Sequence, residues 1–296
     1  MYSPIPWFGG KGRMVEKILP HFPTGYTTYA EPFSGAASLL FAKDPSPVEI
    51  LNDLDADLIN FFRVLRDPEM YEQFERRVTM TLYSRKQYKE CKKLVKERDP
   101  VVRAWSFFVL ARQSFSSRIH QGSFGTVITE SARMMAAMNS KWLSAVEGLP
   151  EVHNRLLEVQ IENQDFRHFI KHYDRKTTFF YLDPPYPEMT RSGGGFKCEL
   201  SEKDHREMVE LLLTLKGVAI LSGYPTPLYT PLEEAGWQRV EFDHVCYAAG
   251  RTKGSNLQGE GKIRQEQGRT ECLWLSTGIP IASEEMTLEQ LFGAQE

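Results

Sequence analysis

The hydrophobic positions divide the chain into two kinds of segment. Short runs rich in β-branched and aromatic residues, without polar alternation, lie at 27–33, 48–51, 156–161, 177–182 and 218–221. Runs of this length and composition are typical of strands that are buried on both faces of a parallel sheet. The pattern therefore predicts an α/β fold built on such a sheet.

Segments between these runs have helical periodicity. This pattern prevails between 63 and 155, where no buried-strand run occurs. The segments with this periodicity are 54–65, 68–80, 84–98, 100–113, 133–148, 202–215 and 230–235. We predict a helical domain at 63–155 that is inserted into a catalytic domain made of 1–62 and 156–279. Strands at 237–247 and 271–275 are expected to form a closing pair.

The run at 177–182 is central because it leads directly into Asp183-Pro184-Pro185-Tyr186. Two consecutive prolines end a strand, since neither can donate to a ladder and each fixes φ. This predicts a rigid loop at the carboxyl end of a central strand, which is where open α/β sheets bind ligands.

That loop offers hydrogen-bond acceptors beside an aromatic face. Asp183 supplies carboxylate oxygens, Pro184 removes a backbone N–H, and Tyr186 supplies a flat ring with a polar tip. An exocyclic amine on a planar ring fits this set, because its two N–H groups can donate to two acceptors while the ring stacks on Tyr186. The alternative is a proline-rich turn with an exposed tyrosine.

A second motif lies near the amino terminus. A strand, a tight turn at Ser34-Gly35 and a helix form the first unit of a doubly wound sheet. The next strand ends at Asp53, 18 residues beyond Gly35, where an acidic residue is placed to bind ribose hydroxyls. Because G-x-G-x-x-G is absent, the implied ligand is a nucleoside without a pyrophosphate. The alternative for Asp53 is the N-cap of the helix at 54–65.

Two more segments are candidates for ligand contact. Trp7-Phe8-Gly9-Gly10-Lys11-Gly12 joins a stacking aromatic to glycines and a cation, although its spacing is not that of a Walker loop and an amino-terminal turn is the alternative. Asn163-Gln164-Asp165-Phe166 follows the strand at 156–161, so Asp165 and Phe166 are placed to hold a second edge of a cofactor.

The charge distribution favours a polyanionic partner more than the net charge of −3 does. Residues 81–125 carry ten positive side chains against three negative ones, residues 250–270 carry five against two, and the tail at 280–296 is acidic. A basic segment on an acidic body can bind a polyanion through one face. A solvated helix face is the alternative.

A loop between the predicted helices combines side chains that contact nucleic acids. It runs from Arg112 to Gly125 and includes Phe115, Ser116 and Arg118. Such residues serve for phosphate contact, for reading base edges and for insertion at base steps. The alternative is a loop that packs on its own phenylalanines.

Composition limits the class of protein. With 296 residues, 41% of them hydrophobic, and no apolar run long enough for a membrane span, we expect a soluble globular protein. The four cysteines are scattered without a C-x-x-C pair, which predicts reduced thiols in the cytoplasm and no metal site.

Taken together, the motifs resemble those of the Dam-like, D12 class of DNA adenine-N6 methyltransferases, in that family's alpha-type order. The resemblance covers nearly all of residues 1–279. The motifs that carry it are Trp7…Gly9-Gly10-Lys11, Glu31-Pro32-Phe33-Ser34-Gly35, Ile50-Leu51-Asn52-Asp53, Asp165-Phe166 and Asp183-Pro184-Pro185-Tyr186. It implies a Rossmann-like sheet dependent on S-adenosylmethionine (AdoMet), with the helical insert as the target-recognition domain.

The resemblance also implies roles in binding the cofactor. Trp7 and Lys11 would line the AdoMet pocket, Phe33 and Gly35 would pass beside the methionine part, and Asp53 would hold the ribose. The residues expected at the adenine end of the cofactor, or shared with the target site, are Asp165, Phe166 and Asp183.

The implied target is an adenine flipped out of double-stranded DNA. Asp183 and the Pro184 carbonyl would hold its N6 amine, and Tyr186 would stack on the base. The DNA-contacting residues would be Arg112, Phe115, Ser116 and Arg118. The family further implies a cytoplasmic, nucleoid-associated protein of bacterial or phage origin, with a restriction endonuclease as a partner from the same system.

Two departures from the family pattern matter. Ala37 replaces the second glycine of Phe-x-Gly-x-Gly, and the loop after Phe115 differs from that of Dam enzymes that read GATC, so that specificity is not carried over. The alternatives for the function are an RNA adenine, cytosine-N4 or protein glutamine methyltransferase, or a DNA-binding protein that has lost catalysis.

Overall fold

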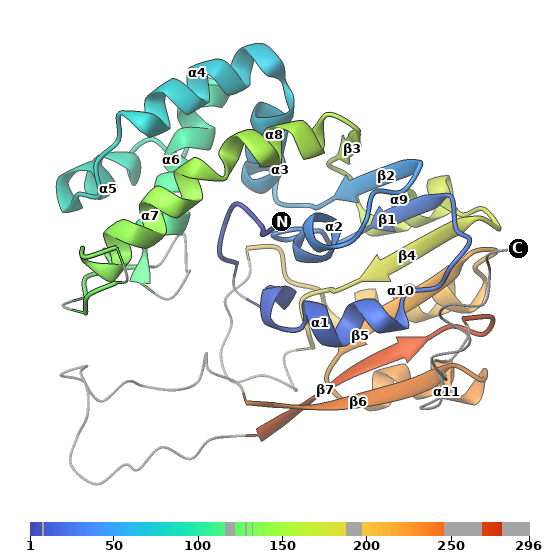
Figure 1. Cartoon of the computed structure of the whole chain (residues 1–296). Coiled ribbons are helices and arrows are strands. Elements are labelled where there is room, and N and C mark those ends of the chain that lie inside the picture. The colour runs from blue at the N-terminus through green and yellow to red at the C-terminus, as the bar shows by residue number, and fades with distance from the viewer. Residues whose placement is uncertain are drawn as a thin grey trace, which may run out of the picture.

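The computed structural model describes residues 1–7, 9–115, 122–127, 129–131, 133–187, 197–245 and 268–279, and a seven-stranded sheet lies at its centre (Figure 1). The strands are β1 (Thr28–Glu31), β2 (Val48–Asn52), β3 (Val159–Glu162), β4 (Thr178–Leu182), β5 (Val218–Gly223), β6 (Gln238–Val245) and β7 (Gly268–Leu275). Their order is β3-β2-β1-β4-β5-β7-β6. The predicted α/β fold with a Rossmann-like sheet is confirmed.

The sheet is parallel from β3 to β5, and β7 runs antiparallel to both β5 and β6. β4 pairs with β1 on one side and β5 on the other, and all five of its residues are buried. The segment at 177–182 therefore forms the central strand, as its unbroken apolar sequence predicts.

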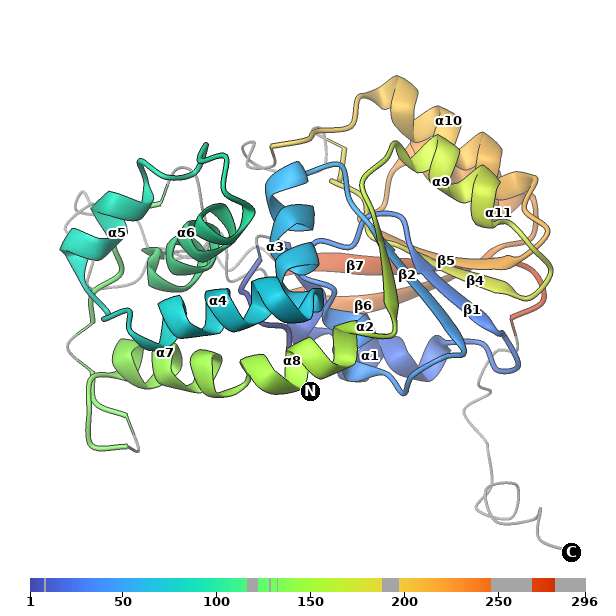
Figure 2. The same ribbon diagram turned by 90° about the horizontal axis from the view of Figure 1, so that it is seen from above.

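Successive strand residues enter two different cores, because side chains alternate across a sheet. Tyr29 and Phe179 belong to one cluster, whereas Ala30 and Phe180 belong to the other. Figure 2 shows the two helical layers. α1 (Val15–Ile18) and α2 (Ser38–Ala42) cover one face, and α9 (Phe166–Tyr173), α10 (Glu202–Leu213) and α11 (Thr230–Glu234) cover the other.

In the described part of the chain between β2 and β3, six α-helices extend to one side of the sheet (Figure 1). They are α3 (Ala56–Arg66), α4 (Pro68–Thr79), α5 (Arg85–Cys91), α6 (Pro100–Gln113), α7 (Ala137–Glu147) and α8 (Leu149–Leu156). Single turns of 3₁₀ helix occur at η1 (Lys11–Arg13), η2 (Leu19–His21) and η5 (Pro227–Tyr229). Within the described ranges, the structure has no helix that is both long and apolar enough to cross a membrane.

Helices α4 and α6 begin where the sequence predicts because each starts at the proline of an Asp-Pro pair. The Asp67 carboxylate accepts from the Met70 amide at 2.9 Å, and the Asp99 carboxylate accepts from the Val101 amide at 2.8 Å. Each proline then occupies the first helical position, where its missing N–H is not needed.

Four predicted boundaries differ from the structure by three residues or more. The strand expected at 271–275 begins at Gly268, where its pairing with β6 already starts. The helix expected at 84–98 ends at Cys91, since the next turns have i,i+3 hydrogen bonds such as Lys93 N to Glu90 O at 2.9 Å. The helix expected at 133–148 begins at Ala137, because residues 130 and 136 pair as an isolated bridge. The strand expected at 156–161 begins at Val159, because Leu156 ends α8.

A buried ion cluster joins the helical region to the sheet. Glu49 of β2 accepts from Lys43 Nζ at 2.5 Å and pairs with Arg155 Nη1 of α8 at 2.5 Å. Glu49 is 1% exposed, so removing either cation would leave its charge less compensated in the interior. The cluster therefore fixes α8 against the start of β2.

A second buried carboxyl group, Glu31, lies at the end of β1. Its Oε1 accepts from the Tyr29 hydroxyl at 2.7 Å and from the Leu40 amide at 3.1 Å. Burial raises the pKa of Glu31 to about 8, and these two hydrogen bonds offset only part of the rise. At a pH between these two pKa values, Glu31 keeps its proton in the folded chain, whereas in the unfolded chain, with the ordinary pKa of 4.5, it has already released it.

Because proton binding and folding are linked, the raised pKa of Glu31 makes the stability of the fold depend on pH. The stabilisation due to protonated Glu31 is complete below the unfolded pKa and is lost as the pH rises through the folded pKa. We expect Glu31→Gln, which keeps a neutral acceptor, to gain melting temperature relative to the wild type as the pH rises from about 5 to about 8. Thermal melts across this range measure the difference. The exposed Glu16→Gln serves as the control, and a gap for Glu31→Gln that is independent of pH would contradict the assignment.

Candidate active site at the carboxyl edge of the sheet

The loops that carry the candidate catalytic and cofactor-binding residues follow the carboxyl ends of the parallel strands, on the side where the helical region lies (Figure 1). The strand order reverses between β1 and β4, since β2 and β3 lie on one side of β1 and β5 lies beyond β4. Ligands bind at such switch points in open α/β sheets. The loops after β1, β2 and β4 are the ones that the sequence marks as candidates.

Asp183 follows β4 and forms an ion pair with Lys11 from the amino-terminal loop. Lys11 Nζ donates to Asp183 Oδ1 at 2.6 Å and to the Gly9 carbonyl at 3.3 Å, and only 7% of Lys11 is exposed. Burial by itself lowers the pKa of Lys11, but Asp183 and Glu271 outweigh it and raise that pKa above its ordinary value. Burial also raises the pKa of Asp183, and Lys11 offsets only part of this rise.

Glu271 of β7 is the second carboxylate in this cluster. Its Oε1 accepts from the Tyr186 hydroxyl and from Ser222 Oγ at 3.0 Å, and it lies 3.5 Å from Lys11 Nζ. Glu271 is 4% exposed. The site is therefore a buried network in which one ammonium group is shared between two carboxylates.

The Tyr186 ring lies within this network rather than projecting into solvent. Lys11 Nζ is 4.9 Å from the ring centroid, and the Tyr224 ring meets it edge-on at 4.7 Å and 74°. Pro184 before it is buried, and Tyr186 is partly exposed. The alternative of a proline-rich turn with an exposed tyrosine does not describe this loop.

The glycine turn after β1 touches the amino-terminal loop. Gly35 has φ +46°, and a Cβ there would lie 3.0 Å from the Trp7 indole, so only glycine fits this approach. Ala37 has φ 52° and is fully buried. The backbone here thus takes the left-handed conformation that glycine adopts readily, at a cost of roughly 1–2 kcal/mol for an alanine.

Asp53 at the end of β2 reaches the same turn. Its Oδ2 accepts from the Gly35 amide at 3.0 Å and its Oδ1 from the Asp55 amide at 2.9 Å. Burial raises the pKa of Asp53 to about 6 despite these hydrogen bonds. The alternative that Asp53 caps the following helix is wrong, because Asp55 caps α3 by accepting from the Asp57 amide at 3.0 Å.

Asn52 joins the ends of three strands and was not singled out from the sequence. Its Nδ2 donates to the carbonyls of Pro32 and Gln164 at 2.9 Å each, and its Oδ1 accepts from the Gln164 amide at 2.9 Å. These bonds hold the loops after β1, β2 and β3 together. In the sequence, the signal for Asn52 is its place in the motif Ile50-Leu51-Asn52-Asp53 at a strand end.

The residues expected at the far end of the cofactor lie on α9. Asp165 caps this helix, accepting from the Arg167 amide at 2.8 Å, and also pairs with the Arg167 guanidinium at 2.9 Å. Phe166 is buried and packs on Phe33, with ring centroids 5.3 Å apart. Phe33 and Phe166 are thereby brought together, and the Asp165 carboxylate already has partners within the chain.

The expected DNA-contacting residues are only partly described. Arg112 Nε donates to the Pro4 carbonyl at 2.7 Å, and burial lowers the pKa of Arg112 to about 10. Phe115 is 54% exposed. Ser116 and Arg118 lie outside the described residues. Arg112 therefore connects the end of α6 to the amino-terminal segment.

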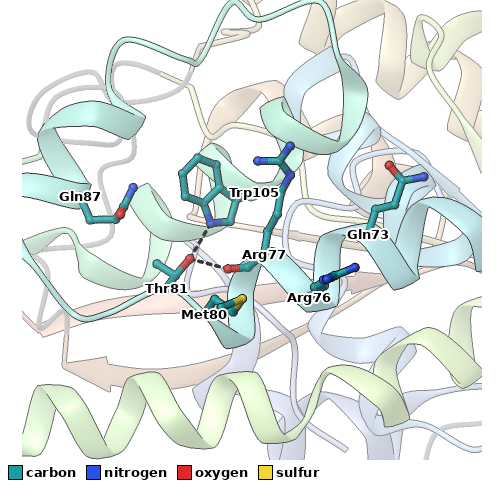
Figure 3. A pocket seen from close by; sticks show the side chains of 7 residues that line it. All are labelled: Gln73, Arg76, Arg77, Met80, Thr81, Gln87 and Trp105. Carbon is teal, nitrogen blue, oxygen red and sulfur yellow. Dashed lines mark hydrogen bonds between the residues drawn. The ribbon is translucent and has the colours of Figure 1, made fainter.

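A separate hollow of about 480 Å³ lies in the helical region (Figure 3). Its lining residues are Gln73, Arg76, Arg77, Met80, Thr81, Gln87 and Trp105. Trp105 Nε1 donates to Thr81 Oγ1 at 2.8 Å, and Thr81 Oγ1 donates to the Arg77 carbonyl at 2.7 Å. None of these residues belongs to the cluster around Asp183.

A sequence profile of D12 class N6 adenine-specific DNA methyltransferases matches residues 7–226. The chain is 24% identical to a type II methyltransferase, M1.LlaDCHI, of Lactococcus lactis subsp. cremoris over 272 residues, which cover 88% of this chain and 92% of the relative. It is 21% identical to a type II methyltransferase, M.CviBI, of Paramecium bursaria Chlorella virus NC1A over 221 residues, which cover 73% and 80%.

A shorter match concerns a DNA adenine methylase of Vibrio cholerae serotype O1. The two chains are 31% identical over 115 residues, which cover 38% of this chain and 41% of the relative. The profile match begins at Trp7 and includes Asp53 and Asp183, whereas Glu271 lies beyond its end.

The contact between Lys11 and Asp183 allows a prediction about the pKa of Asp183. Because Lys11 lowers the pKa of Asp183, we expect Lys11→Met to raise that pKa further. Carboxyl ¹³C NMR titration of aspartate-labelled protein measures it, with Asp183→Asn identifying the signal. Lys17→Met, the same change on an exposed position of α1, should leave it unmoved. An unchanged or lower pKa in Lys11→Met would contradict the geometry.

Proposed function

The chain belongs to the D12 class of N6 adenine-specific DNA methyltransferases, and on this premise we propose that it is a site-specific enzyme that uses AdoMet and acts on an adenine flipped out of double-stranded DNA. The reaction is DNA N6-adenine methylation. The observation that carries the proposal is the cluster of Lys11, Asp183, Tyr186 and Glu271 at the carboxyl edge of the sheet.

The turn between β1 and α2 fits AdoMet. Trp7 lies against Gly35, and Gly35 is bonded to Asp53, so the three residues expected around the cofactor form one continuous wall. Ser34 Oγ in this turn is buried and has no hydrogen-bond partner among the described residues, which suits a site that a polar ligand completes. AdoMet, when bound, supplies an electrophilic methyl group.

Each residue of this wall has a proposed task. The partly exposed Asp53 carboxylate accepts from the ribose hydroxyls, and Phe33 with Phe166 provides an apolar surface beside it. Asp165 lies at the adenine end of the cofactor. Lys11 borders both this wall and the target site through its contact with Asp183.

The loop after β4 holds the target base. Asp183 accepts one N6 hydrogen, the Pro184 carbonyl accepts the other, and the Tyr186 ring stacks on the base. The N6 lone pair of adenine is delocalised into the ring, so two acceptors that favour a more tetrahedral nitrogen make it a better nucleophile. Asp183 must be ionised for this task, and Lys11 favours the ionised form.

The helical region is proposed as the target-recognition domain. Its helix α5 and the following turn carry Lys86, Lys89, Lys93 and other basic side chains, which suit phosphate contact. Phe115 is exposed at the start of the loop that includes Ser116 and Arg118. Arg112 remains proposed as a DNA contact, made from the point where α6 meets the amino-terminal segment. A restriction endonuclease is the proposed functional partner.

Tritium transfer from labelled AdoMet to unmethylated genomic DNA, followed by nucleoside analysis, tests the proposal. We expect N6-methyladenine from the wild type, and no transfer from Asp183→Ala, because a principal acceptor for the amine is then lost. Label in cytosine, RNA or protein would show that the methyl acceptor is that molecule and not adenine in DNA. Cofactor binding without transfer would favour an inactive binder, and an active Asp183→Ala would overturn the mechanism.

The proposed stacking of the target base on the Tyr186 ring allows a second prediction. Tyr186→Ala should weaken transition-state binding by roughly 1–3 kcal/mol, the value of one stacked base. The ratio kcat/KM for DNA measures this loss, and Tyr186→Phe, which keeps the aromatic face, should lose less. A Tyr186→Ala enzyme that loses no more than Tyr186→Phe would show that the ring does not stack on the base.

A further inference from the structure

We propose that Glu271 is a positioning residue for methyl transfer, which holds Tyr186 and Lys11 in the geometry that the target adenine meets. This inference rests on the proposed function and extends it to β7, a strand beyond the region that the family profile matches. Glu271 acts through its neighbours, since its contacts among the described residues include Tyr186, Ser222 and Lys11.

The strand topology explains how a residue so late in the chain reaches the site. β7 runs antiparallel to β5, with Cys272 opposite Gly223, so the first half of β7 lies at the carboxyl edge of the parallel strands. Glu271 points to the same side of the sheet as Leu273, which is buried in the cluster with Tyr181. A charged side chain thus occupies a position where the alternation favours an apolar residue.

Burying a carboxylate is costly unless its charge is compensated, so its partners show what it serves. Ser222 Oγ donates to Glu271 Oε1 at 3.0 Å and lies 3.3 Å from the Tyr186 hydroxyl. Among the described residues, Lys11 Nζ lies 3.5 Å from Glu271 and also pairs with Asp183. These partners border the Asp-Pro-Pro-Tyr loop, which distinguishes Glu271 from Glu49, whose cations join a helix to the sheet.

Glu271 controls two geometric variables. The hydrogen bond from the Tyr186 hydroxyl, with the edge of Tyr224 against the ring, fixes the plane on which a base stacks. The attraction for Lys11 keeps its ammonium group between two carboxylates, which sets the side from which Lys11 approaches Asp183. Lys11 Nζ already lies 2.6 Å from Asp183 Oδ1, so loss of the Glu271 charge would leave the ammonium group free to reorient around Asp183 and compete with the N6 amine for its other oxygen.

Glu271→Gln tests this, because the amide keeps an acceptor and the shape but removes the charge. Single-turnover tritium transfer to unmethylated DNA at saturating substrates should slow by about 10- to 100-fold, the range that small misplacements cost. AdoMet affinity should change by less than about twofold, because the loss lies in the chemical step. Glu241→Gln makes the same change at an exposed position of the adjacent strand β6 and should behave as the wild type.

A double-mutant cycle separates positioning from a merely structural role. Because the phenol and the carboxylate act as a unit, Tyr186→Phe and Glu271→Gln should not have independent effects, and the double variant should be about as slow as the slower single variant. Wild-type rates in Glu271→Gln, multiplying losses in the double variant, or a parallel fall of AdoMet affinity and melting temperature would each overturn the inference.

The same experiments distinguish this inference from the proposed function. A wild type that transfers no label to DNA overturns the proposed function, and the inference with it. A wild type that methylates adenine while Glu271→Gln matches it overturns the inference alone.

Discussion

The ion pair between Lys11 and Asp183, with Glu271 on the other side of the ammonium group, is the interaction on which the site depends. Asp183 is a partly buried acid whose pKa is raised, yet the proposed chemistry needs its carboxylate. Lys11, shared between two carboxylates, favours the ionised form of Asp183 without fully neutralising its charge. The amino-terminal loop, the central strand and the antiparallel strand must therefore all be in place before the acceptor is competent.

This requirement explains why the fold joins distant segments so firmly at one edge of the sheet. Asn52 holds three strand ends together, and Trp7 fills the space that Gly35 leaves open. Arg112 attaches the amino-terminal segment to the end of α6. The amino-terminal loop is therefore a physical connection between the helical region, where DNA contact is proposed, and Lys11.

Ala37 shows how the chain departs from its family at a small energetic cost. The backbone there is left-handed, as a glycine would favour, and the Ala37 amide donates to the Ser34 carbonyl at 2.7 Å. The buried methyl group packs in the core beside Leu40. The turn is thus held by its surroundings, which offset the local strain of an alanine with positive φ.

The sequence by itself determined the sheet strands, the Asp-Pro helix starts and the Asp-Pro-Pro-Tyr loop, because each depends on neighbouring residues and on local periodicity. Tertiary structure alone revealed Glu271, since the contact of Tyr186 with it spans 85 positions and a single glutamate in a strand carries no local signal. It likewise assigned the cap of α3 to Asp55 instead of Asp53 and ended α5 early. Such outcomes depend on which groups meet across the fold, and no local pattern encodes that.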